Sequence, residues 1–304
     1  MAKVKSIGDK YPLPRKATRW VGILFFVIIH LVGIVGAPLY VIYHGVTAAE
    51  WTLFIAYALL TNMAITLGYH RLFAHRTFKA HSVVRFFLLF FGAATFEQSA
   101  LKWASQHRQH HQFTDSAQDP YNIKQGFWYA HMGWILMWKH KVNYDNAHDL
   151  QDSKLVMHQH IWYTPWSFVS GIILPMVIGF AIGAPLGAFV MTICSRLVLV
   201  LNAAFFVNSF CHTFGNNSLD HTISAKDHWL GAFITNGEGY HSFHHRFPSD
   251  YRNGIRWYDW DPTKWLIFIL SKFRLTWDLN KTPAQRIQDA VSIEQSQIQH
   301  PAAV

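Results

Sequence analysis

Charged residues are scarce in this chain of 304 residues. Only 14% are Asp, Glu, Lys or Arg, whereas 51% are hydrophobic, which excludes a disordered protein. There are two cysteines and no CxxC pair, so a disulfide scaffold is excluded as well. Acidic residues number 17 against 26 basic ones, and the resulting formal charge of +9 fits either nucleic acid or an anionic membrane surface.

Four long stretches contain almost no charge: 21–43, 51–69, 166–183 and 188–210. A helix over the first stretch spans about 35 Å, enough to cross a hydrocarbon core of ~30 Å. That stretch is too long for the core of a signal peptide, and no cleavage site of small residues follows it. The four stretches predict transmembrane helices, with Arg196 of the last one facing the protein interior or snorkelling.

The connections within the two predicted hairpins, 44–50 and 184–187, contain no Lys or Arg. Basic residues lie instead in the N-terminal segment, the central loop and the C-terminal segment, which the positive-inside rule puts in the cytoplasm together with both termini. We therefore predict an all-α integral membrane protein with one domain over 1–304 and a cytosolic helical cap over 70–165 and 211–280. The apolar stretch 83–100 is interpreted as an interfacial or re-entrant helix.

Histidine is abundant, with 20 residues, and nine of them form a pattern. The pattern lies at or beyond the predicted cytoplasmic ends of the spans and comprises His70, His75, His107, His110, His111, His212, His241, His244 and His245, with Asn208 one turn before His212. Each HxxHH motif places its three rings on one helix face. His70 and His75 are five residues apart, about 140° around a regular helix. Either the helix ends near Arg71, or these two rings approach a centre from different sides.

Imidazole is the commonest metal ligand in proteins. Nine rings exceed the ligands of one ion but suffice for two ions with four or five ligands each. Structural zinc is usually bound by cysteine, and Cys194 and Cys211 lack that spacing, so redox-active iron is favoured. Carboxylates near the motifs in sequence are candidates to orient the rings: Glu97, Asp115, Asp119, Asp227 and Glu238. The other eleven histidines are interpreted as packed or solvated.

These motifs resemble the membrane fatty acyl desaturases, and specifically the Δ9 acyl-CoA (stearoyl-CoA) type. The resemblance covers about 20–277 and rests on GYHRLFAHR (68–76), WASQHRQHH (103–111), DPYN (119–122), NSFCH (208–212) and NGEGYHSFHHRFP (236–248). It implies a four-helix stem and a cytosolic cap in which the nine histidines hold two iron ions, with Asn208 completing the set through water. It also implies a reaction with O₂ that leaves a cis double bond in a saturated acyl chain.

The resemblance further implies a narrow apolar acyl pocket walled by the spans. Phe54 and Ala58 precede His70 by 16 and 12 residues, and we expect them to limit the depth of this pocket. Animal acyl-CoA enzymes contact CoA through a basic and an acidic residue where this chain has Ser105 and Gln106, and a second basic pair is reduced to Trp138 and Lys139. Acyl-CoA remains the favoured substrate, with Lys102 and Lys139 as candidate phosphate contacts.

No HPGG haem motif occurs in this sequence. We expect electrons from NAD(P)H to arrive through a reductase and a separate donor of the ferredoxin or cytochrome b5 type, attracted by the basic face. The expected location is a bacterial cytoplasmic membrane, or the endoplasmic reticulum in a eukaryote.

Several alternatives remain at this point. The motifs also suit an acyl-lipid desaturase acting on membrane glycerolipid and, less well, a histidine-motif hydroxylase of fatty acids or alkanes. A transporter is disfavoured because its ligands would lie near the bilayer midplane. Nucleic-acid binding is disfavoured because the positive charge follows the cytoplasmic segments of a membrane protein.

Overall fold

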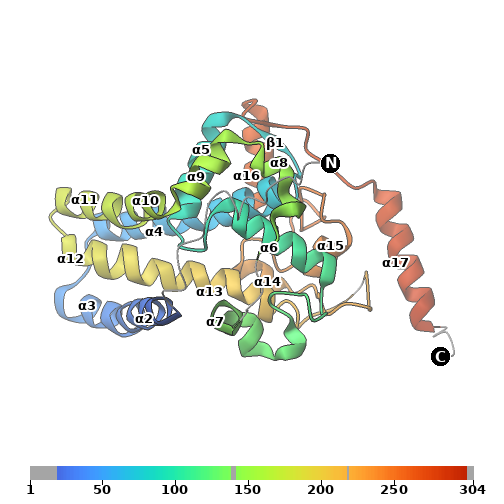
Figure 1. Ribbon diagram of the computed structural model, residues 1–304, viewed down its shortest axis with the longest axis horizontal. Coiled ribbons are helices and arrows are strands. Elements are labelled where there is room, and N and C mark those ends of the chain that lie inside the picture. Colours follow the sequence, from blue (N-terminus) through green and yellow to red (C-terminus); the bar gives the residue numbers. More distant parts are fainter. Residues whose placement is uncertain (1–18, 138–141, 218, 300–304) are drawn as a thin grey trace, which may run out of the picture.

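A computed structural model describes residues 19–137, 142–217 and 219–299 of the chain. Four helices in these ranges are long and apolar enough to cross a membrane: Trp20–His44, Ala48–Ala74, Tyr163–Ala181 and Pro185–Ser209. They lie side by side as a stem, with the remaining helices gathered at one end (Figure 1). The predicted all-α fold with four spans is confirmed, and the chain is a multi-pass integral membrane protein.

Each span is a composite of α-helix and a π-helical stretch, the latter labelled η1, η2, η6 and η7. The first hairpin comprises α2 (Arg19–His30), η1 (Leu31–Gly36), α3 (Ala37–His44), α4 (Ala48–Met63) and η2 (Ala64–Ala74). The second comprises α10 (Tyr163–Phe168), η6 (Val169–Ile173), α11 (Leu174–Ala181), α12 (Pro185–Gly187), η7 (Ala188–Ser195) and α13 (Arg196–Ser209). The second span ends five residues later than predicted, because η2 continues through His70 and Arg71 to Ala74.

A capping box closes the tip of the first hairpin. Thr47 accepts a hydrogen bond from the backbone N–H of Glu50, and the Glu50 carboxylate accepts one from the backbone N–H of Thr47 at 2.8 Å. The other Glu50 oxygen accepts from the Tyr40 hydroxyl at 2.6 Å, which ties the tip to the first span. The only acidic residue of this hairpin is therefore fully engaged by the chain itself.

The cap is built from short helices that follow or precede the spans. Its helices are α5 (Ser82–Ala93), α6 (Ala100–Phe113), η3 (Ile123–Gln125), η4 (Tyr129–Gly133), α7 (Trp134–Met137), η5 (Tyr144–Ala147), α8 (His148–Gln151), α9 (Lys154–Ile161), α14 (Trp229–Ile234), α15 (His241–Arg246), α16 (Pro262–Lys272) and α17 (Ala284–Gln299). The expectation of one helix over 83–100 needs correction, because α5 ends at Ala93 and α6 begins at Ala100. The intervening turn contains Phe96 and Gln98 at positive φ, a conformation that a continuous helix excludes.

Two distant segments of the cap are joined by backbone pairing. Strand β1 (Lys79–Ala80), which follows the second span, pairs in antiparallel register with β2 (Thr276–Trp277), which follows α16. The cap thus closes around the ends of the spans, where Leu67, Phe73, Leu101 and Ile267 belong to one buried apolar cluster. This closure brings the end of the second span, α6 and α15 into one place.

Candidate metal centre

The structure brings all nine pattern histidines together in two neighbouring groups. One group contains His70, His75, His107, His111 and His244, and the other contains His110, His212, His241 and His245. Within each group every residue offers a ring nitrogen, and these atoms lie within 4.8 Å of one another. Five and four imidazoles converging on two points are donor sets suited to two metal ions.

The π-helix η2 explains how His70 and His75 reach the same group. The backbone N–H of His75 donates to the carbonyl of His70 at 3.0 Å, five residues earlier. This i→i+5 bonding widens the turn, so residues five apart return to nearly the same side. The two ring centroids lie 4.8 Å apart. Of the two alternatives offered from the sequence, an end of the helix near Arg71 is wrong, because the helix continues in π geometry to Ala74.

The HxxHH motifs lie on regular helical turns, as their spacing indicates. α6 presents His107, His110 and His111, and α15 presents His241, His244 and His245. The Nε2 atoms of His244 and His111 lie 3.0 Å apart, and those of His241 and His212 also lie 3.0 Å apart. Each motif contributes to both groups, so α6 and α15 hold the two groups in a fixed relation.

Polar partners engage the opposite nitrogen, Nδ1, of four of these rings. The Nδ1 of His70 lies 2.7 Å from Glu238, and that of His110 lies 2.9 Å from Asp119. A carboxylate can only accept, so the His110 ring carries its proton on Nδ1 and presents an unprotonated Nε2 to the group, and the nearby Glu238 carboxylate favours the same tautomer of His70. The hydrogen-bond network thereby assigns the tautomer that metal ligation requires.

The other two partners are hydroxyl groups. The Nδ1 of His107 lies 3.1 Å from the Tyr121 hydroxyl. The Nδ1 of His212 lies 2.7 Å from Ser224, whose own hydroxyl donates to Asp115 at 2.6 Å. A carboxylate therefore fixes the His212 ring through an intervening serine.

A buried ion network links the first histidine motif to the third. Arg71 donates to Glu238 at 3.0 Å and lies 2.9 Å from Asp261, and all three side chains are buried. Asn253 donates to the remaining Glu238 oxygen at 2.7 Å. Burial opposes ionisation of Glu238, but the adjoining His70 ring and the charge of Arg71 outweigh it and lower the pKa of this carboxyl. Glu238 is thus held as an anion against the His70 ring.

The chemistry of the donor set fits metal ions. Burial, reinforced by neighbouring histidines, lowers the pKa well below 6.5 for His75, His107, His111, His212, His241, His244 and His245. These rings are therefore neutral ligands rather than cations. Unprotonated nitrogens that converge within 4.8 Å repel one another unless a cation lies between them. Cys194 and Cys211 are buried elsewhere and belong to neither group.

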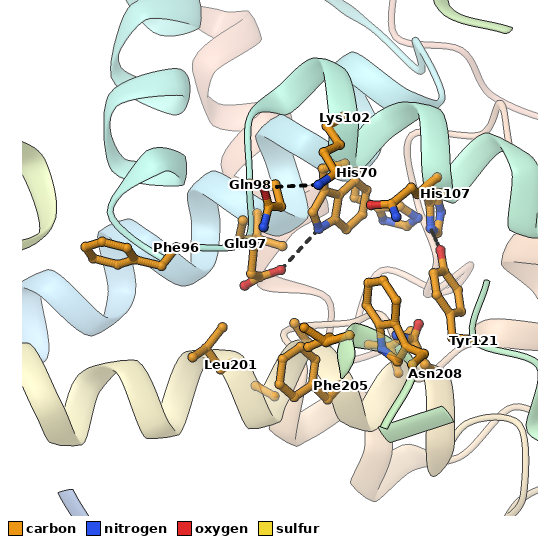
Figure 2. A pocket seen from close by; sticks show the side chains of 18 of the residues that line it. His70, Phe96, Glu97, Gln98, Lys102, His107, Tyr121, Leu201, Phe205 and Asn208 are labelled. Carbon is orange, nitrogen blue, oxygen red and sulfur yellow. Dashed lines mark hydrogen bonds between the residues drawn. The ribbon is translucent and has the colours of Figure 1, made fainter. Parts of the chain in front are cut away.

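A cavity of about 600 Å³ lies directly against the first group. His70 and His107 line it beside apolar side chains such as Ile65, Leu201 and Phe205. Figure 2 shows Phe96 and Leu201 at one end and Tyr121 and Asn208 at the other, with the two histidines above. The volume is within the usual range of ligand sites, about 300–1,000 Å³.

The amino-acid sequence is similar to known proteins over most of its length. The fatty acid desaturase family model matches residues 46–268. The chain is 40% identical to the probable acyl-CoA desaturase of Schizosaccharomyces pombe, over 88% of this chain and 57% of that protein. It is 38% identical to acyl-CoA desaturase 1 of Saccharomyces cerevisiae, over 80% and 48%. It is 35% identical to stearoyl-CoA desaturase of Sus scrofa, over 89% and 76%.

The chain belongs to the fatty acid desaturase family. The matched residues run from just before the second span to α16, so they include every histidine of both groups. The aligned part of this desaturase-family chain spans about half the length of the S. pombe and S. cerevisiae relatives.

Of the predicted substrate contacts in this desaturase-family fold, Lys102 lines the cavity, whereas Ala58 and Phe54 do not. Lys102 donates to Gln98 at 3.3 Å and has a pKa lowered by burial. The lining of the cavity reaches Asn62 on α4, and Ala58 and Phe54 lie one and two turns deeper on the same helix. Lys139, together with Trp138, lies outside the described residues. Asn208 lines the cavity one turn before His212.

Of the five carboxylates proposed to orient the rings, Asp119 and Glu238 contact a ring directly and Asp115 contacts one through Ser224. Asp227 instead accepts from the backbone N–H groups of Ser242 and Phe243 at the start of α15. Glu97 accepts from the Trp103 indole at 3.1 Å. Sequence reasoning assigned no role to Ser224 or Asp261. No spacing marks Ser224, and Asp261 is distinguishable only as the N-cap preceding Pro262 at the start of α16.

Proposed function

We propose that this chain is an O₂-dependent acyl desaturase that introduces a cis double bond, at Δ9, into a saturated acyl chain carried by CoA. The observation that carries the proposal is the position of the first histidine group at the wall of an apolar cavity, with the second group beside it. The names of the acyl-CoA and stearoyl-CoA desaturases that this chain resembles support the same substrate class.

The reaction removes one hydrogen atom from each of two adjacent CH₂ groups. O₂, two electrons and two protons are consumed, and the products are one C=C bond and two molecules of water. Side-chain acids and bases cannot break an unactivated C–H bond, so a metal–oxygen oxidant is required. We assign two iron ions to the histidine groups, with Asn208 bound through water. When bound, this centre supplies the oxidising power, and the protein positions the acyl chain beside it.

The residues around the cavity position the acyl chain and exclude water from it. Trp103 stacks on His107 with the ring centroids 4.9 Å apart, and its indole N–H donates to Glu97. Trp103 is thereby held as a rigid part of the cavity wall beside the first histidine group. Such a wall restricts which carbons of an acyl chain approach the centre.

The acyl carrier has a second candidate, a membrane glycerolipid. Ser105 is buried, and its hydroxyl donates to the Asn143 carbonyl and to the Asn146 side chain. The position where the resemblance implies a basic CoA contact is therefore neutral and already engaged within the protein. This observation favours a carrier with few phosphate contacts, whereas the relatives' names favour acyl-CoA.

We further propose that the cap faces the cytoplasm and receives electrons from a separate protein, of the ferredoxin or cytochrome b5 type, and its reductase. The support is the absence of positive charge from both hairpin connections, 44–50 and 184–187. A basic surface attracts an acidic donor, and this attraction weakens as salt is added.

The proposed activity is tested by expression in a host that lacks its own Δ9 desaturase, followed by analysis of membrane fatty acids. We expect cis-9 monounsaturated acids from the wild-type chain and none from His111→Ala or His245→Ala at equal protein level. His228, which is partly exposed and belongs to neither histidine group, provides the control variant His228→Ala. No unsaturated product from metal-loaded wild type with donor present contradicts the proposal.

A further inference from the structure

One end of the cavity is closed by three aromatic side chains from three different segments. Phe25 comes from α2, Phe96 from the turn between α5 and α6, and Phe168 from α10. The centroids of Phe25 and Phe96 lie 5.4 Å apart, and those of Phe96 and Phe168 lie 6.0 Å apart. All three line the cavity. We call this set the aromatic closure.

The aromatic closure separates the cavity from the membrane by a single layer of side chains. Phe168 lines the cavity, yet 48% of its surface is exposed, and Val21 also lines the cavity with 63% exposed. Both residues belong to membrane-spanning helices, so their exposed surface meets lipid rather than water. The cavity wall at this end is therefore in contact with acyl chains of the bilayer.

The cavity wall next to the aromatic closure is different in character. Gln98, Lys102 and Gln106 line it there, and they are polar or charged. Lys102 and Gln98 lie together in Figure 2, above the carboxylate of Glu97. A polar carrier group is suited to this polar part of the wall, whereas an acyl chain is suited to the aromatic end.

The turn that carries Phe96 has a strained backbone. Phe96 has φ 61° and Gln98 has φ 81°, values that bulky side chains rarely adopt. Strain of this kind persists only where the surrounding structure enforces it, and it gathers at clamps and switching segments. The Phe96 ring is therefore held over the cavity by its surroundings rather than by its own preference.

Arg196 supplies much of that constraint from within the fourth span. Its guanidinium donates to the carbonyl of Ala94 at 2.6 Å and to that of Gly171 at 3.2 Å, and its Nε donates to Thr192 at 3.0 Å. Among the described residues no carboxylate forms an ion pair with it. A fully buried cation bound only to carbonyls thus joins the Phe96 turn to the third span.

Gly171 provides the space in which the Phe96 ring lies. A Cβ atom at this position would lie 2.7 Å from Cε2 of Phe96 and 3.0 Å from the Ala94 carbonyl oxygen. Real Cβ atoms do not approach that closely, so any side chain here displaces the ring or the turn. The position of Phe96 depends on a glycine, an arginine and a strained backbone acting together.

We propose that the aromatic closure is a second, lipid-facing mouth of the cavity, through which acyl chains exchange directly with the bilayer. This inference rests on the proposed acyl substrate. With a lateral mouth, the chain enters and leaves sideways while its polar carrier stays at the interface near Lys102. An acyl chain then avoids crossing water, which is unfavourable for every CH₂ group that becomes exposed. Displacement of the Phe96 ring opens the mouth.

The test measures how fast a bound pyrene-labelled stearoyl-CoA leaves the full-length protein in lipid nanodiscs. In the variant Phe25→Cys/Phe168→Cys, a short cleavable bis-maleimide joins α2 to α10 across Phe96. We expect this cross-link to slow release about tenfold or more, and cleavage of the linker to restore the rate. The wild-type chain, whose cysteines are buried, receives the same treatment as the control.

A substitution tests the opposite direction. Gly171→Ala displaces Phe96, so we expect faster release, whereas Gly36→Ala meets only ordinary contacts with Val32 and leaves the rate unchanged. If Gly171→Ala does not fold, the cross-linked protein still decides the question. Release that is indifferent to the cross-link overturns the lateral mouth.

Product formation by the wild-type chain is measured in parallel. Unsaturated product together with an unchanged release rate refutes the lateral mouth and leaves the proposed function intact. A release rate that responds to the cross-link without any unsaturated product supports the mouth as an acyl path and refutes the proposed reaction.

Discussion

Single residues around the metal centre act mainly by fixing imidazole rings. Glu238 illustrates this, because one of its oxygens contacts His70 and the other is held by Arg71 at 3.0 Å. The carboxylate sets both the tautomer and the orientation of a ring that also lines the cavity. Loss of the charge would leave His70 free to rotate and Arg71 without one of its two buried anionic partners.

We therefore predict that Glu238→Gln lowers metal affinity by about 10–100-fold, as is usual for groups that orient a ligand. Metal content after dialysis against a competing chelator measures this effect. Glu294→Gln is the matched control, because Glu294 is also buried and pairs with a histidine, His221, that belongs to neither metal group. Equal metal retention by the two variants would show that Glu238 does not support the centre.

Glu97 is a buried carboxyl on the cavity wall, and its protonation depends on that burial. Burial raises the pKa of this carboxyl to about 8, although hydrogen bonds from Trp103 and Thr95 oppose the shift. The folded protein keeps a proton that an unfolded chain releases near 4.5, so folding stability from this group falls as the pH rises between these values. At neutral pH, Glu97 is therefore an uncharged acid on the cavity wall.

Above a pH of about 8, Glu97 ionises and places a charge beside the bound acyl chain. We predict that the KM for the acyl substrate rises through this pH in the wild-type protein and stays flat in Glu97→Gln. Initial rates at saturating donor, on both sides of the transition, measure the effect. A parallel rise in KM in the variant would place the titrating group elsewhere.

Among the elements, the second span carries most of the functional geometry. Its α4 part reaches the cavity at Asn62, and its η2 part presents His70 and Arg71. The length and apolar character of the span are predictable from sequence because they depend only on composition. The π-helical geometry of η2 was not, because a one-residue change in hydrogen bonding leaves no mark in hydrophobic periodicity.

Ala58 is buried one turn before Asn62, outside the residues that line the cavity, and we expect a larger side chain there to press toward the cavity end. We predict that Ala58→Leu shifts the preferred substrate toward shorter acyl chains. Product profiles from a mixture of saturated acyl-CoA chain lengths measure this shift. Ala56→Leu adds the same side chain to an exposed position of the same helix and is expected to change nothing. An unchanged profile in Ala58→Leu would contradict a depth-limiting role for this position.

At the scale of the whole molecule, the metal centre joins parts of the chain that are distant in sequence. The first group draws on η2, α6 and α15, and the second adds the segment after α13. Without a cation, the neutral imidazoles of α6 and α15 converge with nothing between them. The centre is therefore expected to stabilise the cap as well as to catalyse.

We predict that removal of the metal with a strong chelator lowers the thermal midpoint of the cap, and that added Fe²⁺ restores it. A ligand at 100 times its Kd contributes about 2.7 kcal/mol to the folded state. Thermal unfolding monitored by cap tryptophan fluorescence measures the change. A midpoint that is indifferent to chelation would mean that the cap is rigid without metal.

The sequence alone predicts the spans, the cap and the nine histidines, because hydrophobic length and helical spacing are local properties. It does not predict the partition of the histidines into groups of five and four, since each HxxHH motif contributes to both. The hydroxyl partners Tyr121 and Ser224 and the Phe96 turn also depend on contacts between distant segments. Long-range packing decides which local motif meets which partner.

The central claim is that two metal ions at these histidines desaturate an acyl chain in the adjacent cavity. The most direct test supplies iron-loaded protein in nanodiscs with O₂, a reduced donor and stearoyl-CoA carrying two deuterium atoms on each of carbons 9 and 10. Mass spectrometry then counts the deuterium and oxygen atoms in the product. We predict a cis-9 alkene that has lost two deuterium atoms and gained no oxygen. An alcohol that has lost one deuterium and gained one oxygen, or recovery of unchanged substrate alone, would contradict the claim.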